Sequence, residues 1–182
     1  MNWRLHEAVR LLCEGGVIAY PTETVYGLGC DPYNPAAVLY LLTLKQRDIN
    51  QGLILIASSI AQLEPFLDSP SASILRRITR PSSTPRTWVV PCRKETPAWL
   101  TGAHNTLAIR ITSHPVARAL CDGLGSALVS TSANLHGQQP AVSALRVRKI
   151  FGNRLAAIVH GSCGSGKPSA ILDAASGKVL RN

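Results

Sequence analysis

Three short polar clusters contain the side chains of this 182-residue chain that could take part in binding or catalysis. The first cluster, Pro-Thr-Glu-Thr at residues 21–24, follows the apolar run 17–20 and leads into a turn that contains Gly27 and Gly29. A strand that stops at a proline, exposes hydroxyls and a carboxylate and then turns on glycines lets a ligand approach the backbone closely. The segment therefore predicts a binding loop, although an ordinary strand-to-helix turn would have a similar composition.

The second cluster consists of Lys45, Gln46 and Arg47. It stands at the C-terminal end of a helix predicted for residues 35–44, which has Asn34 as a suitable N-cap and a proline at its first position. Cations at the end of a helix interact favourably with the helix dipole, so a purely structural role competes evenly with a role in binding.

The third cluster is Ser-Thr-Ser-Ala-Asn at residues 130–134, directly after the apolar residues 127–129. Its three hydroxyls and one amide offer many hydrogen-bond partners at the point where a predicted strand leaves the core. A turn rich in Ser and Thr is the alternative interpretation. The recurrence of polar clusters at the ends of apolar runs favours a common binding site.

The elements that must position these clusters alternate along the chain, with short apolar runs between helix-like segments. This alternation is typical of an α/β domain rather than a helical bundle or a β-sandwich. Strands are predicted at residues 17–21, 53–57, 88–91, 107–112, 127–130, 156–159 and 170–173. Helices are predicted at residues 3–13, 35–44, 60–67, 71–78, 115–122 and 142–151. No repeat, charged tail or low-complexity linker divides the sequence, which predicts a single domain over residues 1–182.

The composition narrows the range of partners without choosing among them. Lys and Arg total 19 against 10 Asp and Glu, and the formal net charge of +9 predicts an anionic partner such as nucleotide phosphates, RNA or a membrane surface. The five cysteines are far apart and form no CxxC pair, so they are expected to be reduced thiols of a cytoplasmic protein. No apolar run approaches the ~18 residues of a membrane span, and the N-terminus is unlike a signal peptide, so no membrane partner is expected.

Two candidate motifs, a phosphate-binding P-loop and a histidine metal site, are incomplete in this sequence. Residues 161–167 nearly match a phosphate-binding P-loop, but Pro168 stands where Ser or Thr is required, and a strand rather than a helix is predicted next. The five histidines show no zinc-binding spacing, so no metal ligand set is predicted. His114 is interpreted as a helix-entry residue, and no Ser-His-Asp order is evident.

The order and spacing of the motifs resemble those of one family, the YrdC-type threonylcarbamoyl-AMP synthases in their short, single-domain form. The resemblance extends over nearly the whole chain and includes PTETVYGLG at residues 21–29, the KxR pair Lys45 and Arg47, GLILIA at 52–57, LAIRIT at 107–112, His-Pro at 114–115, STSAN at 130–134, KPSAILD at 167–173 and GKVLR at 177–181. It implies an α/β fold in which helices flank a twisted, mixed, open sheet with a basic concave face.

The resemblance also implies an activity and a set of site residues. The implied enzyme is a nucleotidyltransferase that converts L-threonine, bicarbonate and ATP into threonylcarbamoyl-AMP and pyrophosphate, for threonylcarbamoyladenosine formation in tRNA. With Lys45 and Arg47 as the catalytic pair, the residues expected to contact ATP are Lys45, Arg47, Gln51, Thr106, Ser132, Asn134, Pro140 and Arg181. The residues expected to contact L-threonine are Thr24, Arg110, Ser130 and Ser169.

The same resemblance implies further partners. Mg²⁺ is expected on the ATP phosphates without a dedicated carboxylate cage, and Glu23 is the one candidate ligand. Downstream threonylcarbamoyl-transfer proteins, and tRNA or other RNA, are the macromolecular partners. The main competing interpretation is a non-catalytic RNA-binding or ribosome-assembly protein, but aromatic residues make up only 5% of the chain and do not alternate with the cations, as stacking surfaces for RNA require. A carbamoyl-phosphate-handling domain of a larger transferase is a third interpretation, which the match over the whole chain disfavours.

Overall fold

One mixed sheet connects all the strands of the computed structural model, which describes residues 3–82, 84–135, 137–164, 166 and 169–181. The nine strands found in these residues follow the spatial order β7-β1-β2-β6-β3-β5-β4-β8-β9. Pairing is parallel between β1 and β7, β3 and β5, and β4 and β8, and antiparallel elsewhere. The strands are β1 (Ile18–Pro21), β2 (Tyr26–Gly29), β3 (Ile54–Ala57), β4 (Arg86–Pro91), β5 (Thr106–Ile111), β6 (Leu128–Ser132), β7 (Ala157–Ile158), β8 (Ala170–Asp173) and β9 (Val179–Arg181).

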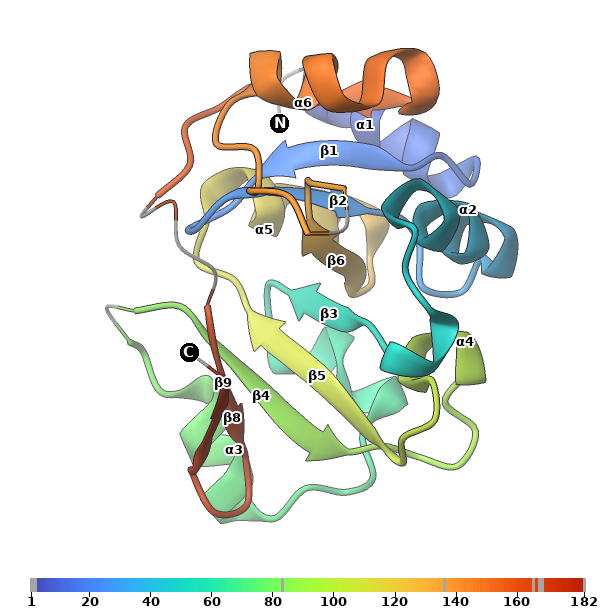
Figure 1. Ribbon diagram of the computed structural model, residues 1–182. Helices are drawn as coiled ribbons and strands as arrows, with labels where there is room; N and C mark the ends of the chain where they lie inside the picture. The colour runs from blue at the N-terminus through green and yellow to red at the C-terminus, as the bar shows by residue number, and fades with distance from the viewer. Residues whose placement is uncertain (1–2, 83, 136, 165, 167–168, 182) are drawn as a thin grey trace.

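Helices flank this sheet, as the ribbon in Figure 1 shows. They are α1 (Trp3–Cys13), α2 (Pro35–Lys45), α3 (Ala72–Thr79), α4 (Ala98–Thr101), α5 (Pro115–Leu124) and α6 (Ala144–Phe151), with 3-10 turns η1 (Ile49–Gln51), η2 (Ile60–Gln62), η3 (Glu64–Phe66) and η4 (Gly152–Arg154). Side chains of β1 alternate between two hydrophobic clusters, since Ile18 and Tyr20 pack with α1 and α5 whereas Ala19 belongs to the larger cluster with α2 and α6. The predicted mixed open sheet flanked by helices is confirmed.

Most predicted elements are present, with ends shifted by at most two residues. The helix predicted at 60–67 is wrong, because the segment forms two separate 3-10 turns, η2 and η3. Pro65 lies inside this segment, and a proline can neither donate the helical hydrogen bond nor avoid the carbonyl four residues earlier. The prediction that helix 35–44 starts at an Asn34 cap is confirmed, since the Asn34 side chain accepts from the N–H of Ala37.

The glycine-rich segment after the first polar cluster is a strand, which corrects the predicted turn. Gly27 and Gly29 belong to β2, which pairs with β1 on one side and β6 on the other. A Cβ atom on Gly29 would lie 2.5 Å from the carbonyl oxygen of Val129 and 2.8 Å from the ring of Tyr20. The glycines therefore allow close packing of strands. Similarly, the third cluster begins inside a strand, because residues 130–132 extend β6.

The connection from β7 to β8 joins distant positions in the sheet order. Part of it packs on the first polar cluster, where the N–H groups of Gly164 and Gly166 donate to the carbonyls of Thr22 (3.2 Å) and Thr24 (2.9 Å). In the near-match to a P-loop, residues 165, 167 and 168 lie outside the described residues, and the strand predicted to follow is present as β8.

Two sequence expectations concern the chain as a whole. All five cysteines are free, as predicted. Within the described residues, no helix combines the length and the apolar character needed to cross a membrane.

Candidate active site

A cavity of about 730 Å³ brings the three polar clusters together. Its lining comes from β2, β3, β4, β5, β6, β8 and β9, from η1 and α4, and from the loops that follow β1, α2, α4, β6 and β7. All the predicted site residues except Lys45 line it, namely Thr24, Arg47, Gln51, Thr106, Arg110, Ser130, Ser132, Asn134, Pro140, Ser169 and Arg181. Clusters that are far apart in the sequence thus share one site.

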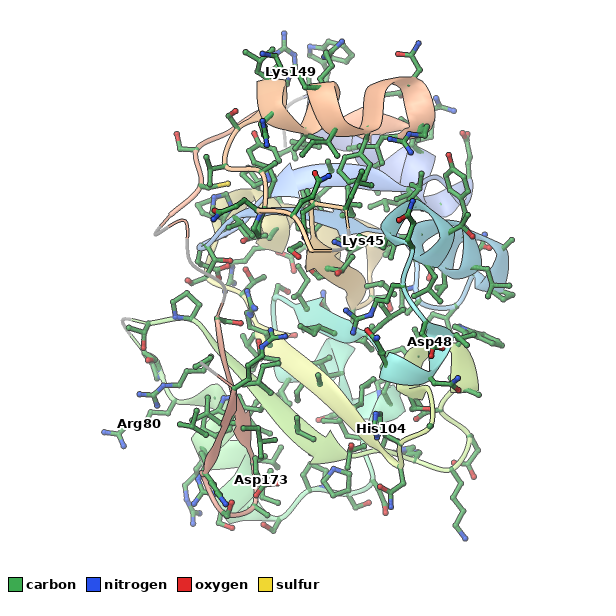
Figure 2. All side chains as sticks on the ribbon, viewed as in Figure 1. Lys45, Asp48, Arg80, His104, Lys149 and Asp173 are labelled. Carbon is green, nitrogen blue, oxygen red and sulfur yellow. The ribbon has the colours of Figure 1, made fainter. Side chains whose placement is uncertain are left out.

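Lys45 lies between α2 and β6, directly behind the part of the lining that Ser132 and Asn134 form (Figure 2). It is only 5% exposed. Its Nζ donates to the carbonyl oxygens of Ser132 and Asn134, both at 2.6 Å, and to Oδ1 of Asn134 at 2.8 Å. All three ammonium protons therefore have oxygen partners. Burial, and secondarily the charge of Arg47, lower the pKa of Lys45 to about 8. In this arrangement Lys45 fastens α2 to the segment after β6.

The turn after α2 directs Arg47 away from Lys45 and into the cavity. Gln46 ends the helix in the left-handed conformation (φ 49°), and its N–H bonds back to helix carbonyls. Nη2 of Arg47 donates to the carbonyl of Gly52 at 2.8 Å, while its Nε is buried without a partner among the described residues. Burial, and then the charge of Arg181, lower the pKa of Arg47. An anionic ligand would relieve both effects.

The charged side chains among the described lining residues are all positive. Arg47, Arg110 and Arg181 line the cavity, and this lining includes no Asp or Glu. Burial lowers the pKa of Arg110, and the charge of Arg181 lowers it further, although Glu23 opposes the shift. Partly desolvated like charges repel one another unless a counter-ion is present, so the cavity suits a ligand with several negative charges.

Two hydroxyl groups hold the guanidinium of Arg110. Its Nε and Nη2 donate to Oγ1 of Thr87 at 3.2 and 3.0 Å, and Nη2 also donates to Oγ of Ser169. Thr87 is fully buried on β4, beside β8, and Ser169 directly precedes β8. Among the described residues, these bonds use Nε and Nη2 and not Nη1. A guanidinium fixed in this way can direct its remaining donors at a carboxylate or a phosphate.

The hydroxyls of the first polar cluster are ordered by hydrogen bonds to one another. Oγ1 of Thr22 donates to the carbonyl of Val25 at 2.7 Å and accepts from the N–H of Thr24. Because the Thr22 proton is already used, the 3.1 Å contact between the two hydroxyls is a donation from Thr24. The Thr24 oxygen is thus left as an acceptor, and Thr24 lines the cavity.

Glu23, the candidate metal ligand, fastens the first polar cluster to the start of α5. Its Oε1 accepts from Oγ1 of Thr112 at 2.7 Å and from the N–H groups of Ser113 and His114 at 2.6 and 3.2 Å. Burial raises the pKa of Glu23, but these hydrogen bonds lower it, and the net shift is downward. No group of three or more His, Cys, Asp or Glu residues that could hold a metal ion occurs in the described part of the chain. The described residues therefore offer no carboxylate cage for Mg²⁺.

An apolar end of the cavity was missed in the sequence. Leu100, Thr101 and His104 line it, in α4 and just after it. A helix as short as α4 has no recognisable periodicity, so these residues form no pattern of their own in the sequence. Gly52 was the only usable signal, because a Cβ there would lie 2.8 Å from the carbonyl oxygen of Thr101. An apolar surface with one imidazole suits a planar ring.

Comparisons with known proteins extend over nearly the whole chain. The Sua5/YciO/YrdC family model, described as telomere recombination, matches residues 10–182. A threonylcarbamoyl-AMP synthase of Alkalilimnicola ehrlichii is 50% identical over 99% of this chain and 96% of its own length. A threonylcarbamoyl-AMP synthase of Coxiella burnetii is 46% identical over 97% of this chain and 96% of its own length.

Solved structures share the same architecture. The structure of P. abyssi Sua5 complexed with L-threonine superposes with a TM-score of 0.85 and 30% identity, covering 94% of this chain and 51% of the Sua5 chain. This chain therefore spans about half the length of Sua5. The structure of E. coli YciO has a TM-score of 0.83 and 26% identity, covering 98% of this chain and 88% of its own.

Proposed function

The chain belongs to the Sua5/YciO/YrdC family, and from this membership we propose that it is a threonylcarbamoyl-AMP synthase, a nucleotidyltransferase that joins L-threonine, bicarbonate and ATP and releases pyrophosphate. The observation that carries the proposal is the 50% identity, over 99% of the chain, to a relative of that name. The cavity supports it, because its described lining gathers cations and neutral hydroxyls. The product would supply the threonylcarbamoyl group that modifies adenosine in tRNA.

In this proposal, L-threonine occupies the part of the cavity lined by Thr24, Arg110, Ser130 and Ser169. The guanidinium of Arg110, anchored through Nε and Nη2, keeps the N–H groups of Nη1 for the carboxylate of threonine. The Thr24 oxygen, which is left as an acceptor, suits an N–H of the amino group. The Sua5 complex with L-threonine supports an amino-acid site in this family.

ATP occupies the remainder of the cavity. Its base would lie on the apolar end near His104, and its phosphates would lie near Arg47 and Arg181. The other residues assigned to ATP are Gln51, Thr106, Ser132, Asn134 and Pro140. Lys45 adds positive charge from behind, and its ammonium can touch a phosphate only by giving up one of its three oxygen partners. Mg²⁺ would enter on the phosphates as part of the substrate, because the ion keeps phosphate and water ligands readily.

Catalysis would then rest on alignment and charge neutralisation. The amine of threonine adds to CO₂ derived from bicarbonate, and the resulting carbamate oxygen attacks the α-phosphorus of ATP and displaces pyrophosphate. Arg47 and Arg181 offset the charge that shifts onto the departing phosphates, while Arg110 holds the threonine carboxylate. Alignment alone can lower such a barrier by ~7 kcal/mol or more, so no covalent enzyme intermediate is needed.

Pyrophosphate release tests the proposal directly. The purified protein is given ATP and Mg²⁺, with L-threonine and bicarbonate supplied together or omitted singly. Release that requires both co-substrates is the expected result. Release that ignores either one, or no release from folded protein under any condition, would contradict the synthase function.

The remaining parts of the proposal concern the domain organisation, the location and the macromolecular partners of the enzyme. We propose that residues 1–182 work as one domain in the cytoplasm and pass the product to downstream transfer proteins. The exposed cations of α6, Arg146, Arg148 and Lys149, offer a surface for tRNA or other RNA, and such binding would accompany catalysis. It would weaken with rising salt and on replacing these three residues with Ala.

A further inference from the structure

Two fully buried hydroxyl groups, on Thr87 and Tyr20, bond to serines of the cavity without lining the cavity themselves. Oγ1 of Thr87, on β4, lies 2.8 Å from Oγ of Ser169. The phenol of Tyr20, on β1, donates to Oγ of Ser130 at 2.8 Å. Both serines are among those we assign to L-threonine. The direction of these two hydrogen bonds therefore determines whether each serine can donate its own hydroxyl proton to the ligand.

The direction of the bond between Thr87 and Ser169 follows from counting protons. Oγ1 of Thr87 accepts from Nε and Nη2 of Arg110, which occupies both of its lone pairs. The proton in the contact with Ser169 must therefore come from Thr87. Oγ of Ser169 then accepts twice, from Thr87 and from Nη2 of Arg110. The Ser169 proton is left to be donated to a further acceptor.

Ser130 is prepared in a similar way. Because Tyr20 donates to it, one lone pair of Ser130 is occupied and its own proton remains to be donated. Burial raises the pKa of Tyr20, so the phenol keeps its proton at physiological pH. Gly27 leaves room for this pair, since a Cβ there would lie 3.3 Å from the Tyr20 oxygen and 3.4 Å from the Ser130 oxygen.

We propose that Thr87 and Tyr20 are positioning residues that set Ser169 and Ser130 as hydrogen-bond donors and thereby restrict this end of the cavity to an ionised carboxylate. Arg110 and Ser169 then form a donor-only site, while Ser130 adds its own donor and keeps its second lone pair. A carboxamide presents its own N–H donors to this surface and leaves groups unpaired, so it should bind poorly. The inference rests on the proposed function, since it takes the threonine carboxylate as the group that is recognised.

The test is Thr87→Val, which keeps the shape of the side chain and removes the hydroxyl. Loss of the Thr87 proton gives Ser169 a free lone pair, so the preference for L-threonine over L-threoninamide, measured as competing ligands, should fall about tenfold. The KM for L-threonine should rise by a similar factor, while the KM for ATP stays at the wild-type value. Thr87→Ser should restore both quantities, because it returns the hydroxyl.

Thr96→Val is the matched control. It also removes a buried threonine hydroxyl, which donates to the carbonyl of Phe66 at 3.0 Å, but Thr96 does not line the cavity. Its preference for L-threonine over the amide should equal that of the wild type. A similar loss of preference in Thr96→Val and Thr87→Val would overturn the proposal, because general destabilisation would then explain both.

Tyr20→Phe provides the second test and decides the question if Thr87→Val does not fold. It should lower the same preference without changing the KM for ATP. Folded Thr87→Val or Tyr20→Phe protein with the wild-type preference would overturn the proposal. If the wild type releases no pyrophosphate, the proposed function fails. Calorimetric binding of L-threonine and L-threoninamide then still tests the donor-only site.

Discussion

Replacing Lys45 with Met tests whether this lysine organises the site or contacts the substrate. Met keeps most of the volume but removes the donors to the carbonyls of Ser132 and Asn134 and to Oδ1 of Asn134. A buried acceptor without a partner costs ~1–3 kcal/mol. The wild-type ammonium has itself been desolvated, as its pKa of about 8 indicates, so the lower end of that range applies. Oδ1 of Asn134 keeps its bond from Oγ of Ser132, so the two carbonyls that lose the lysine reduce the free energy of unfolding by about 2 kcal/mol.

For a chain of this size, each kcal/mol corresponds to about 2–4 °C in Tm, so the midpoint of thermal unfolding of Lys45→Met, followed by circular dichroism, should fall by about 4–8 °C. Lys149→Met, on the exposed surface of α6, is the control and should unfold like the wild type. The KM for ATP should also rise, because Ser132 and Asn134 lose their support. A wild-type Tm combined with a strongly reduced kcat would refute this reasoning and place the ammonium on the phosphates.

Three further substitutions test Arg110 in the cavity lining and two residues, Gly164 and Glu23, that hold the first polar cluster in place. Arg110→Lys should raise the KM for L-threonine at least about tenfold in the pyrophosphate assay, because an ammonium cannot reproduce the fixed fork held by Thr87 and Ser169; an unchanged KM would remove Arg110 from the amino-acid site. Gly164→Ala should lower the free energy of unfolding in urea by about 1–3 kcal/mol, since the new Cβ would lie 1.9 Å from the carbonyl oxygen of Glu23; wild-type stability would contradict this packing. Folding lowers the pKa of Glu23 from 4.5, so the stability that its carboxylate contributes is present above that value and is lost as the pH falls through the lower folded-state pKa. The free energy of unfolding of Glu23→Gln should therefore fall less than that of the wild type as the pH is lowered. If both proteins lose stability equally with pH, groups other than Glu23 cause the loss.

Sequence patterns correctly predicted the elements of the fold that depend on residues close together in the chain. They failed for elements that depend on contacts between distant residues. The cap at Asn34 and the apolar runs of the strands act within a few residues, and these predictions are confirmed. Gly27 and Gly29 have the composition of a turn, but the reason for glycine lies in Tyr20 and Val129, which meet them across the sheet. Only the strand pairing reveals this contact.

The candidate site shows the same division between local and distant causes. Motif resemblance was sufficient to select residues that meet in one cavity, although it could not say how they are supported. The three oxygen partners of Lys45 lie 87 and 89 residues further along the chain. Thr87 and Tyr20 have the sequence context of ordinary strand residues. The hydroxyl of Thr87 acquires a role only through β5 and β8, on either side of β4, and that of Tyr20 only through β6, which lies beyond β2 in the sheet.

The position of these supports explains how a site without a nucleophile can be effective. Ser169 and Arg110 are anchored through Thr87 at β4, β5 and β8, whereas Ser130 is anchored through Tyr20 at β1 and β6. In the sheet order β3 separates these two groups of strands, so a ligand that contacts both serines bridges two parts of one sheet. The distance between its contacts is then set by strand spacing and not by loop conformation, which holds side chains to the tolerance that alignment requires. Substitutions that shift β3 relative to β6 should therefore impair catalysis even where every polar side chain is retained.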